Sequence, residues 1–305
     1  MEEIKISILV PIYGTEKYIA KCAHSLFNQK YENIEYIFVN DCTQDNSVNI
    51  LKQVILQYPN RKRQIKIINH KQNGGLAKAR LTGITNATGD YIWCVDSDDY
   101  IEEHALEIIK EYFNQNYDMI FFDYVVCSAT EESIMRRNKI TVNSLLSMRI
   151  PFPIWSSIVK RSLIVSNEIL PIEHIDYSED YVMMSRLIVS CENYVNINKS
   201  LYYYNIMNLN SYMHNVDKDK IIQSCKGALN VFKYLNKKKK GLHAFYYYIA
   251  IRYIQLYRIE KNNPILQDLS DYMYSINYFI TYILLKIKKI KIYEILLKAY
   301  RFIIR

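Results

Sequence analysis

The sequence lacks several patterns that mark other classes of protein. Its six cysteines are scattered and form no C-x-x-C pair, and its histidines show no metal-binding spacing. Such cysteines are typical of a reducing compartment. No apolar run approaches the roughly 18 residues of a membrane-spanning helix, and the first residues lack the basic segment of a signal peptide. We therefore expect a cytoplasmic protein without a transmembrane segment.

The composition is that of a folded chain. The 305 residues are 50% hydrophobic, which permits a sizeable core in one large domain or two modest ones. Apolar, β-branched runs alternate with segments of helical spacing through the first half of the chain. The alternation predicts an α/β fold with a doubly wound, mostly parallel sheet. The expected strands are 6–10, 35–39, 65–68, 91–95 and 118–124, and the expected helices are 18–27, 48–55, 76–85 and 102–113.

The pattern changes after about residue 140. A rigid, proline-flanked connection at 151–155 leads into a predicted short helix that runs to Arg161. A helix is expected to begin at 178–180, and one or two strands at 195–204. From residue 217 onward the spacing is helical, with expected helices at 221–235, 242–259 and two more after Pro264. We therefore predict a first domain of residues 1–215 and a helical C-terminal region of residues 216–305.

Three aspartates follow the predicted strand 91–95. Asp96, Asp98 and Asp99 lie within four residues of one another, at the strand end where open α/β sheets bind ligands. Such carboxylates repel one another unless a cation lies between them, and their hard oxygens suit Mg²⁺ or Mn²⁺. The alternative is an acidic turn in which Asp99 caps the next helix.

The other predicted strands also end in polar or glycine-containing segments. These are residues 11–14, 40–45 and 70–80. Alone, each has an ordinary explanation: Asp41 as a turn former, Gly74 and Gly75 as a helix entry, and Arg80 as a solvated side chain. Because the carboxyl ends of parallel strands meet at one edge, we expect all of these segments to share a cleft with the aspartates.

In these residues the chain resembles the glycosyltransferase family 2 enzymes, which have a GT-A fold. The resemblance is strong over the first 125 residues and weaker to about residue 215. It is carried by residues 10–13, 25–29, 39–41, 73–80, 87–91 and 95–99. Three positions depart from the family pattern: Cys42-Thr43 replaces Gly-Ser, Gly14 replaces Asn, and Leu81 replaces Asn. None of the three removes a charged or metal-binding group.

The resemblance implies roles for several of these residues. Pro11 and Tyr13 would line a nucleotide pocket, Asp41 would pair with the base, and Arg80 would lie near the nucleotide. Residues 96–98 would be the D-x-D element of the family. In that element Asp98 would be the direct ligand of Mn²⁺ or Mg²⁺, and Asp96 would reach the ribose or a metal-bound water.

A second acidic pair, Glu179 and Asp180, follows Ser178. Acids at a helix start interact favourably with its positive end, which is the ordinary explanation. A positioned carboxylate can also remove the proton of an acceptor hydroxyl. The resemblance places the general base on Asp180, with Glu179 as its supporting neighbour.

Two further residues are weaker candidates for contact with the sugars. Trp155 could stack on a sugar or could equally belong to the core. His214 stands where related enzymes often carry a polar residue near the diphosphate, although a lone histidine is more often structural.

Basic and apolar residues alternate at the C-terminal end of the chain. The formal net charge is +8, and residues 278–305 contain Lys286, Lys288, Lys289, Lys291, Lys298, Arg301 and Arg305. This amphipathic pattern suits an anionic membrane surface. The alternative is a set of packed helices with a solvated basic face. We expect no nucleic-acid partner, because no nucleic-acid-binding motif accompanies the charge.

These features, together with the resemblance, imply an inverting, metal-dependent glycosyltransferase. The expected donor is a nucleotide-sugar, with UDP as the expected nucleotide, and the acceptor is a hydroxyl of a glycan or lipid-linked molecule in surface polysaccharide synthesis. The expected location is the cytoplasm, peripheral on the inner face of the membrane. A sugar-nucleotide pyrophosphorylase would need a glycine-rich loop after the first strand, which residues 11–14 are not. A catalytically degenerate nucleotide-binding or scaffold protein of the same fold remains the alternative.

Overall fold

The computed structural model describes residues 3–137, 140–208 and 216–276. The chain forms two compact units that alternate along the sequence. The first unit comprises residues 1–138, 153–174 and 191–214, and the second comprises 139–152, 175–190 and 215–305. The domain boundary at 215 stays a prediction, and two earlier segments also belong to the second, helical unit.

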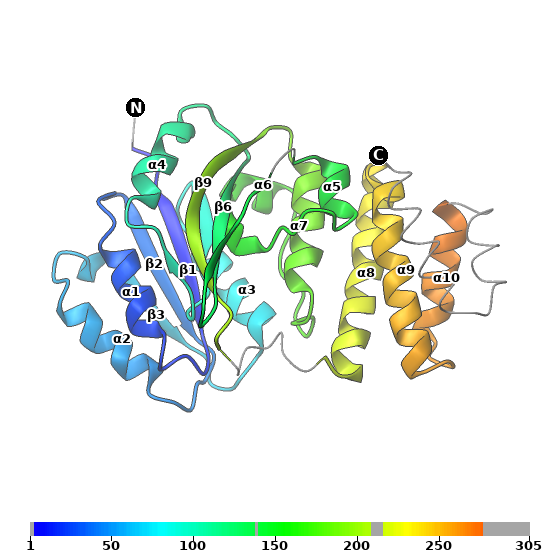
Figure 1. Cartoon of the computed structure of the whole chain (residues 1–305), viewed down its shortest axis with the longest axis horizontal. Helices are drawn as coiled ribbons and strands as arrows, with labels where there is room; N and C mark the ends of the chain where they lie inside the picture. Colours follow the sequence, from blue (N-terminus) through cyan, green and yellow to red (C-terminus); the bar gives the residue numbers. More distant parts are fainter. Residues whose placement is uncertain (1–2, 138–139, 209–215, 277–305) are drawn as a thin grey trace. The chain divides into compact units, whose positions relative to one another are not determined.

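The first unit is built on a nine-stranded sheet, counted over the described residues. Four parallel strands come first in space, in the order β3-β2-β1-β4. They are β1 (Ile6–Ile12), β2 (Ile34–Asn40), β3 (Ile65–Asn69) and β4 (Tyr91–Cys94). Nearly every residue of β1 is buried, as expected of a strand covered on both faces. The predicted α/β fold is confirmed (Figure 1).

The sheet continues beyond β4 in the order β8-β6-β9-β5, and β7 pairs with β6. These strands are β5 (Tyr100–Ile101), β6 (Met119–Cys127), β7 (Glu132–Met135), β8 (Ser157–Lys160) and β9 (Tyr194–Asn205). β8 is antiparallel to both β4 and β6, and β9 is parallel to β6. The carboxyl end of β9 therefore lies at the same edge of the sheet as that of β4.

The predicted helix running to Arg161 is wrong. A 3₁₀ turn (Ile154–Ser156) is followed by β8, and the helix α6 (Arg161–Ser166) only begins at that arginine. The apolar residues Ile158 and Val159 are buried between the two neighbouring strands. Strand pairing on both sides thus decides the conformation of a segment too short to show its period.

Helices cover both faces of the parallel strands. They are α1 (Ile19–Phe27), α2 (Ser47–Leu56), α3 (Leu76–Asn86) and α4 (Ala105–Phe113), with a 3₁₀ turn at Lys62–Gln64. Ile8 and Val10 share one core with α1, α2 and α4. Leu9 points to the other face, where a methyl group added to Gly83 of α3 would lie 3.3 Å from its Cβ. The two faces confirm the doubly wound arrangement.

Gln29 shows why one of the family-like segments has a structural role. Its side chain is buried, and its Nε2 donates to the carbonyl oxygens of Ser25 at 3.0 Å and Glu102 at 2.9 Å. Its Oε1 accepts from the N–H of Leu106 at 3.1 Å, in the first turn of α4. Gln29 therefore links the end of α1 to the start of α4.

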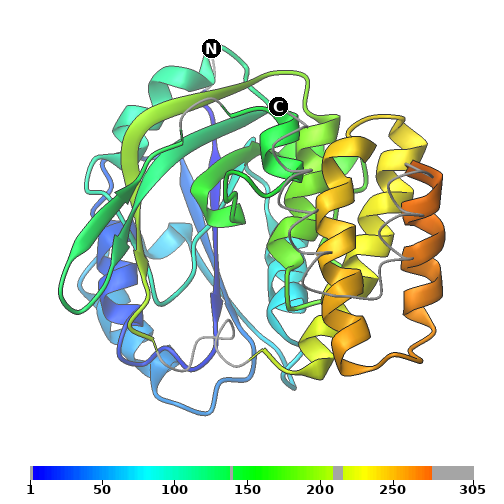
Figure 2. The same cartoon turned by 45° about the vertical axis from the view of Figure 1, so that its right-hand side comes forward.

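The second unit is helical. Its elements are α5 (Val142–Leu146), α7 (Glu179–Ser190), α8 (Lys218–Lys238), α9 (Leu242–Ile259) and α10 (Ile265–Ile276). Helices α7, α8, α9 and α10 lie side by side in that order (Figures 1 and 2). The predicted helices at 178–180, 221–235 and 242–259 are confirmed. The basic segment 278–305 lies outside the described residues.

The long helices α8 and α9 meet at a tight corner. Lys239 has a φ of +52° and Gly241 a φ of +80°, and a methyl group added to Gly241 would lie 2.4 Å from Cδ1 of Leu146. Glycine is therefore required at 241, where α5 packs against the corner. None of the helices in the described part of the chain combines the length and apolar character needed to cross a bilayer.

Candidate active site

Hydrogen bonds join the carboxyl ends of the four parallel strands into one rim. The N–H of Asp41 donates to the carbonyl of Ile12 at 3.0 Å, and the N–H of His70 donates to that of Asn40 at 2.9 Å. On the other side, the N–H of Val95 donates to the carbonyl of Leu9 at 2.9 Å. The segments that follow β1, β2, β3 and β4 therefore lie along one edge, as the sequence predicted.

Asp41 lies at the end of β2 and is 3% exposed. Its Oδ1 accepts from the N–H of Gly74 and its Oδ2 from the N–H of Gly75, both at 2.8 Å. Nδ1 of His70 lies 2.7 Å from Oδ1 of Asp41, and the other ring nitrogen of His70 lies 2.9 Å from the hydroxyl of Thr82. Asp41 thus fixes the glycine entry to α3, while its contact with a base stays a prediction.

His70 is a site residue that sequence reasoning did not assign. It joins the end of β2 to the middle of α3 through Asp41 and Thr82. The available signal was its position directly after β3, at the same edge as Asp41.

Tyr13 and Pro11 lie at the end of β1. Tyr13 is 57% exposed, and Pro11 is half-buried. The N–H of Gly14, which has a φ of +67°, donates to the hydroxyl of Thr43 at 2.9 Å. The N–H of Glu16 donates to Oδ2 of Asp45 at 2.9 Å. These bonds join the loops after β1 and β2, so two of the departures from the family pattern, Gly14 and Thr43, are partners in the structure.

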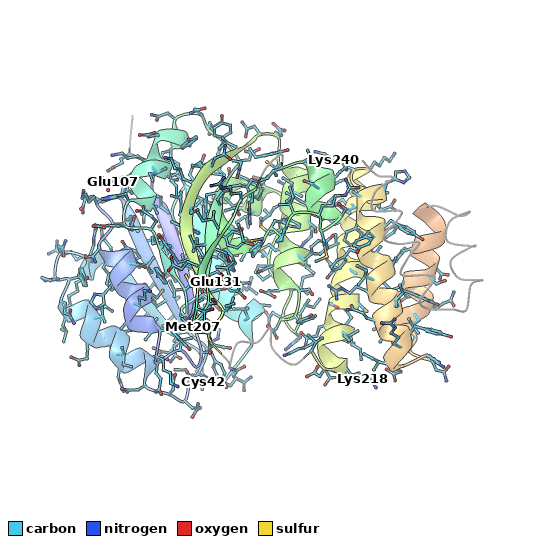
Figure 3. All side chains as sticks on the ribbon, viewed as in Figure 1. Cys42, Glu107, Glu131, Met207, Lys218 and Lys240 are labelled. Carbon is cyan, nitrogen blue, oxygen red and sulfur yellow. The ribbon has the colours of Figure 1, made fainter. Side chains whose placement is uncertain are left out.

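Cys42 adopts a left-handed backbone conformation, with a φ of +59°. Glycine accepts this region freely, whereas any side chain with a Cβ is strained there. The glycine of the family pattern is therefore explained by the backbone, and Cys42 keeps the same turn at a conformational cost. Figure 3 shows Cys42 at the end of the sheet where β2 finishes.

We expect substitutions at Cys42 to separate by backbone preference. Cys42→Val should lower the free energy of unfolding by about 1–2 kcal/mol, because a β-branched residue is disfavoured at positive φ. Cys42→Gly should stay within about 1 kcal/mol of wild type, since relief of strain offsets the greater entropy of the unfolded chain. Denaturant unfolding measures both. A valine variant as stable as wild type would contradict the left-handed turn.

Asp96 forms an ion pair with Arg80 of α3. Nη2 of Arg80 donates to Oδ1 of Asp96 at 2.8 Å, and Arg80 is 2% exposed whereas the Asp96 side chain is 23% exposed. The N–H of Asp96 donates to the hydroxyl of Tyr202 at 3.1 Å. The pair therefore fixes the first acid of the D-x-D segment and leaves part of its carboxylate at the surface.

Asp99 does not cap the next helix, which was the alternative explanation of the acidic turn. The residue preceding α4 is His104. Asp99 is buried, and its carboxylate accepts from the hydroxyl of Tyr202 at 2.6 Å and from the N–H of Asn205 at 2.7 Å. Burial, together with the charges of Asp98 and Asp96, raises the pKa of Asp99 well above its ordinary value. Asp99 thus joins the acidic loop to β9.

Asp98 is half-buried beside the segment that follows β9. Its Oδ2 accepts from Nδ2 of Asn208 at 2.8 Å, and its carbonyl accepts from Nδ2 of Asn205 at 3.1 Å. Burial raises the pKa of Asp98, because the hydrogen bond from Asn208 and the charge of Arg80 offset only part of the desolvation. Its ionised form would therefore be favoured by further positive charge.

Three residues of β9 and its continuation support this loop, and sequence reasoning missed all of them. Tyr202, Asn205 and Asn208 each bond to an aspartate of the cluster. The signal was weak: two asparagines at the end of a tyrosine-rich strand, whose place beside the acidic loop depends on strand order. Figure 3 shows Met207 of this segment at the end of the sheet that also carries Cys42.

The acidic loop fits a divalent cation bound together with phosphate. Across the described residues, no group of three or more His, Cys, Asp or Glu side chains is arranged to hold a metal by itself. Mg²⁺ and similar ions are commonly bound by one or two carboxylates plus the phosphates of a substrate. Asp98, with Asp96 beside it, offers that donor set at the rim, and the pKa of Asp98 is raised by burial.

Glu179 and Asp180 lie in the first turn of α7, in the second unit. Both are half-buried. Ser178 precedes them with a φ of +69°, whereas residues that cap helix starts usually have extended backbone. The carbonyl of Ser178 accepts the first helical bond, from the N–H of Val182 at 3.0 Å. The assignment of Asp180 as the base and Glu179 as its neighbour stays a prediction.

The two weaker candidates have different outcomes. Trp155 is buried, its ring stacks on those of Tyr202 and Tyr204 with centroid distances of 4.5 Å and 5.1 Å, and its carbonyl accepts from Nε1 of Trp93. This favours the core alternative over stacking on a sugar. His214 lies outside the described residues.

The sequence of the chain matches those of known glycosyltransferases. The model of the family described as "Glycosyl transferase family 2" matches residues 7–166. The uncharacterized glycosyltransferase EpsJ of Bacillus subtilis is 32% identical over 216 residues, which cover 65% of this chain and 60% of EpsJ. The poly(ribitol-phosphate) β-N-acetylglucosaminyltransferase TarS of Staphylococcus aureus is 26% identical over 66% of this chain and 35% of TarS.

Solved structures share the fold. The crystal structure of residues 1–349 of Staphylococcus aureus TarS, in complex with UDP-GlcNAc, aligns over 90% of this chain and 82% of that one, with a TM-score of 0.71 and 19% identity. The mannosyltransferase PcManGT of Pyrobaculum calidifontis, in complex with GDP-Man and Mn²⁺, aligns over 100% of this chain and 86% of that one, with a TM-score of 0.58 and 13% identity.

The chain spans less than two thirds of EpsJ and about a third of TarS. These matches therefore concern only the part of each protein that aligns with this chain. The family match covers the β1–β4 rim, the acidic loop and the strand β8. By this match, the chain belongs to glycosyl transferase family 2.

Proposed function

We propose that the protein transfers a sugar from a nucleotide-sugar donor to a hydroxyl group of a glycan or lipid-linked acceptor. UDP is the proposed nucleotide, because the TarS structure with the same fold was solved with UDP-GlcNAc. Relatives include TarS and the minor teichoic acid biosynthesis protein GgaB of Bacillus subtilis, which supports a role in bacterial surface polysaccharide or teichoic acid synthesis.

The observation that carries this proposal is the acidic loop at the rim of the sheet. Asp96 and Asp98 lie at the surface end of a buried network that also contains Arg80, Tyr202 and Asn208. Burial raises the pKa of Asp98, so a cation bound beside this carboxylate would favour its ionised form. A nucleotide diphosphate bound with a divalent cation would supply the missing charge balance.

The residues of the first unit would bind the donor. Pro11 and Tyr13 would contact the nucleoside, Asp41 the base, and Arg80 with Asp96 the ribose or diphosphate side. Asp98, with Asp96, would hold Mn²⁺ or Mg²⁺, and the bound ion would neutralise charge that develops on the departing diphosphate.

Asp180 would act as the general base. Its carboxylate takes the proton of the acceptor hydroxyl, and the oxygen then attacks C1 of the donor sugar from the face opposite the diphosphate. The new C1–O bond forms as the bond from C1 to the diphosphate oxygen breaks, so the configuration at C1 inverts. Glu179 would support the orientation of Asp180.

The inner face of the membrane is the proposed place of action. The support is the sequence of segment 278–305, in which basic and apolar residues together suit an anionic membrane surface.

A panel of donors tests the proposed function. We expect purified protein to hydrolyse or transfer from at least one of a set of UDP- and GDP-sugars, with faster turnover when Mn²⁺ or Mg²⁺ is added. Release of the free nucleoside diphosphate is the measurement, and UDP titrations with and without Mn²⁺ run beside it. UDP binding that ignores the metal, with no turnover of any donor, would favour the degenerate scaffold instead.

A further inference from the structure

A side chain of α8 binds the backbone just before α7. Oε1 of Gln223 accepts from the N–H of Asp176 at 2.9 Å and from the N–H of Tyr177 at 3.1 Å. Both donors are half-buried, and all three residues belong to the second unit. Because backbone N–H groups away from water need partners, this carbonyl oxygen satisfies two successive donors at once.

The segment bound in this way leads directly to the acidic pair of α7. Ser178, the residue after Tyr177, has a φ of +69°, and Glu179 and Asp180 follow in the first helical turn. A non-glycine residue at positive φ persists only when its surroundings fix it there. The contacts with Gln223 on one side and the start of α7 on the other provide that constraint.

Gly227 strengthens the contact one turn further along α8. Residues 223 and 227 lie on the same face of the helix. A methyl group added to Gly227 would lie 2.5 Å from Cγ2 of Val182 and 3.4 Å from Cγ2 of Ile175. Helix α8 therefore contacts Ile175 and Val182 at Gly227, and the backbone of Asp176 and Tyr177 through Gln223. Figure 3 labels Lys218, the first residue of α8, and Lys240, which lies just after its last residue.

We propose that Gln223 is a positioning residue for the proposed base Asp180. The inference rests on the proposed function, in which Asp180 receives the proton of the acceptor hydroxyl. A base must lie within hydrogen-bond reach of that proton, and a displacement of about 1 Å can cost up to about 100-fold in rate. Loss of the two hydrogen bonds would free the Asp176–Ser178 backbone and with it the carboxylate, whereas the donor site of the first unit would be unaffected.

Three variants of α8 test this role. Gln223→Leu removes the acceptor oxygen and should lower kcat by roughly 10- to 100-fold, with KM for the donor and UDP affinity unchanged. In the same variant, the backbone amide hydrogens of Asp176 and Tyr177 should exchange with solvent faster than in the wild type. Gln223→Glu keeps an acceptor oxygen at the same reach and should restore most of the rate and the protection. Asn230→Leu makes a similar change at an exposed position of α8 and should alter neither.

The results that would overturn the positioning role of Gln223 differ from those that would overturn the assignment of Asp180 as the base. A Gln223→Leu protein with faster amide exchange but wild-type kcat would overturn the positioning role. So would a rate loss that Gln223→Glu fails to restore. If the leucine variant does not fold, Gln223→Asn, whose amide is one carbon shorter, is measured instead, and a folded variant with wild-type kcat has the same meaning. Asp180→Asn runs in parallel: wild-type turnover in that variant would refute the base itself, whereas its loss beside an unaffected Gln223→Leu would refute only the positioning.

Discussion

Asp98→Asn is expected to reduce sugar transfer by about 10²- to 10³-fold, the effect typical of removing one electrostatic contact to developing charge. The variant should also lose the metal-dependent part of UDP binding, because an amide is a far weaker ligand for Mn²⁺ or Mg²⁺ than a carboxylate. Turnover assays and UDP titrations with and without Mn²⁺ measure the two effects.

The stability of the same variant gives an independent check. Burial raises the pKa of Asp98, and the charge of Asp98 raises that of the buried Asp99, so neutralising Asp98 should leave the melting temperature unchanged or higher. Glu103→Gln, which removes an exposed charge just before α4, is the matched control and should change neither activity nor stability. Near wild-type rates for Asp98→Asn with Mn²⁺ would show that the D-x-D assignment is wrong.

Asp180→Asn is the second large effect that we expect. An amide cannot accept the proton of the acceptor hydroxyl, so the transfer rate should fall by at least the roughly 10²-fold typical of a lost general base. UDP affinity should be unchanged, because the proposed nucleotide contacts are in the first unit. Initial rates at saturating donor, together with UDP titration, measure this separation.

Asp219→Asn is a suitable control for this second substitution. Asp219 is an exposed acid in the first turn of α8, so its replacement changes a helix-start charge without touching the proposed base. Loss of UDP binding in Asp180→Asn would instead assign Asp180 to the nucleotide site or to the fold.

The sequence predicted the parallel half of the sheet because each strand there is a run rich in apolar residues that is followed by a segment of helical period. It mispredicted β8, four residues whose strand conformation depends on pairing with β4 and β6. Trp155 was ambiguous for a related reason, since only its stacking on Tyr202 and Tyr204 places it in the core.

The residues of the candidate site also fall into two groups, those that could be predicted from the sequence and those that could not. Asp41, Arg80, Asp96 and Asp98 could be selected because each lies close to the end of a predicted strand or the start of a predicted helix. Tyr202, Asn205 and Asn208 could not, because they are distant in sequence from the acidic loop that they bond to. Local patterns identify groups that carry charge, whereas the neutral residues that orient them depend on which strands become neighbours.

The alternation of the two units along the chain constrains how such an enzyme can be recombined. Helix α7 packs its buried residues, among them Tyr181 and Val182, within the helical unit, yet it is encoded between two segments of the sheet unit. A chimera that joins residues 1–215 to the C-terminal part of a relative would pair α7 with foreign helices. Exchange between relatives should therefore succeed when residues 139–152, 175–190 and 215–305 are all taken from the same relative, because these three segments form one unit.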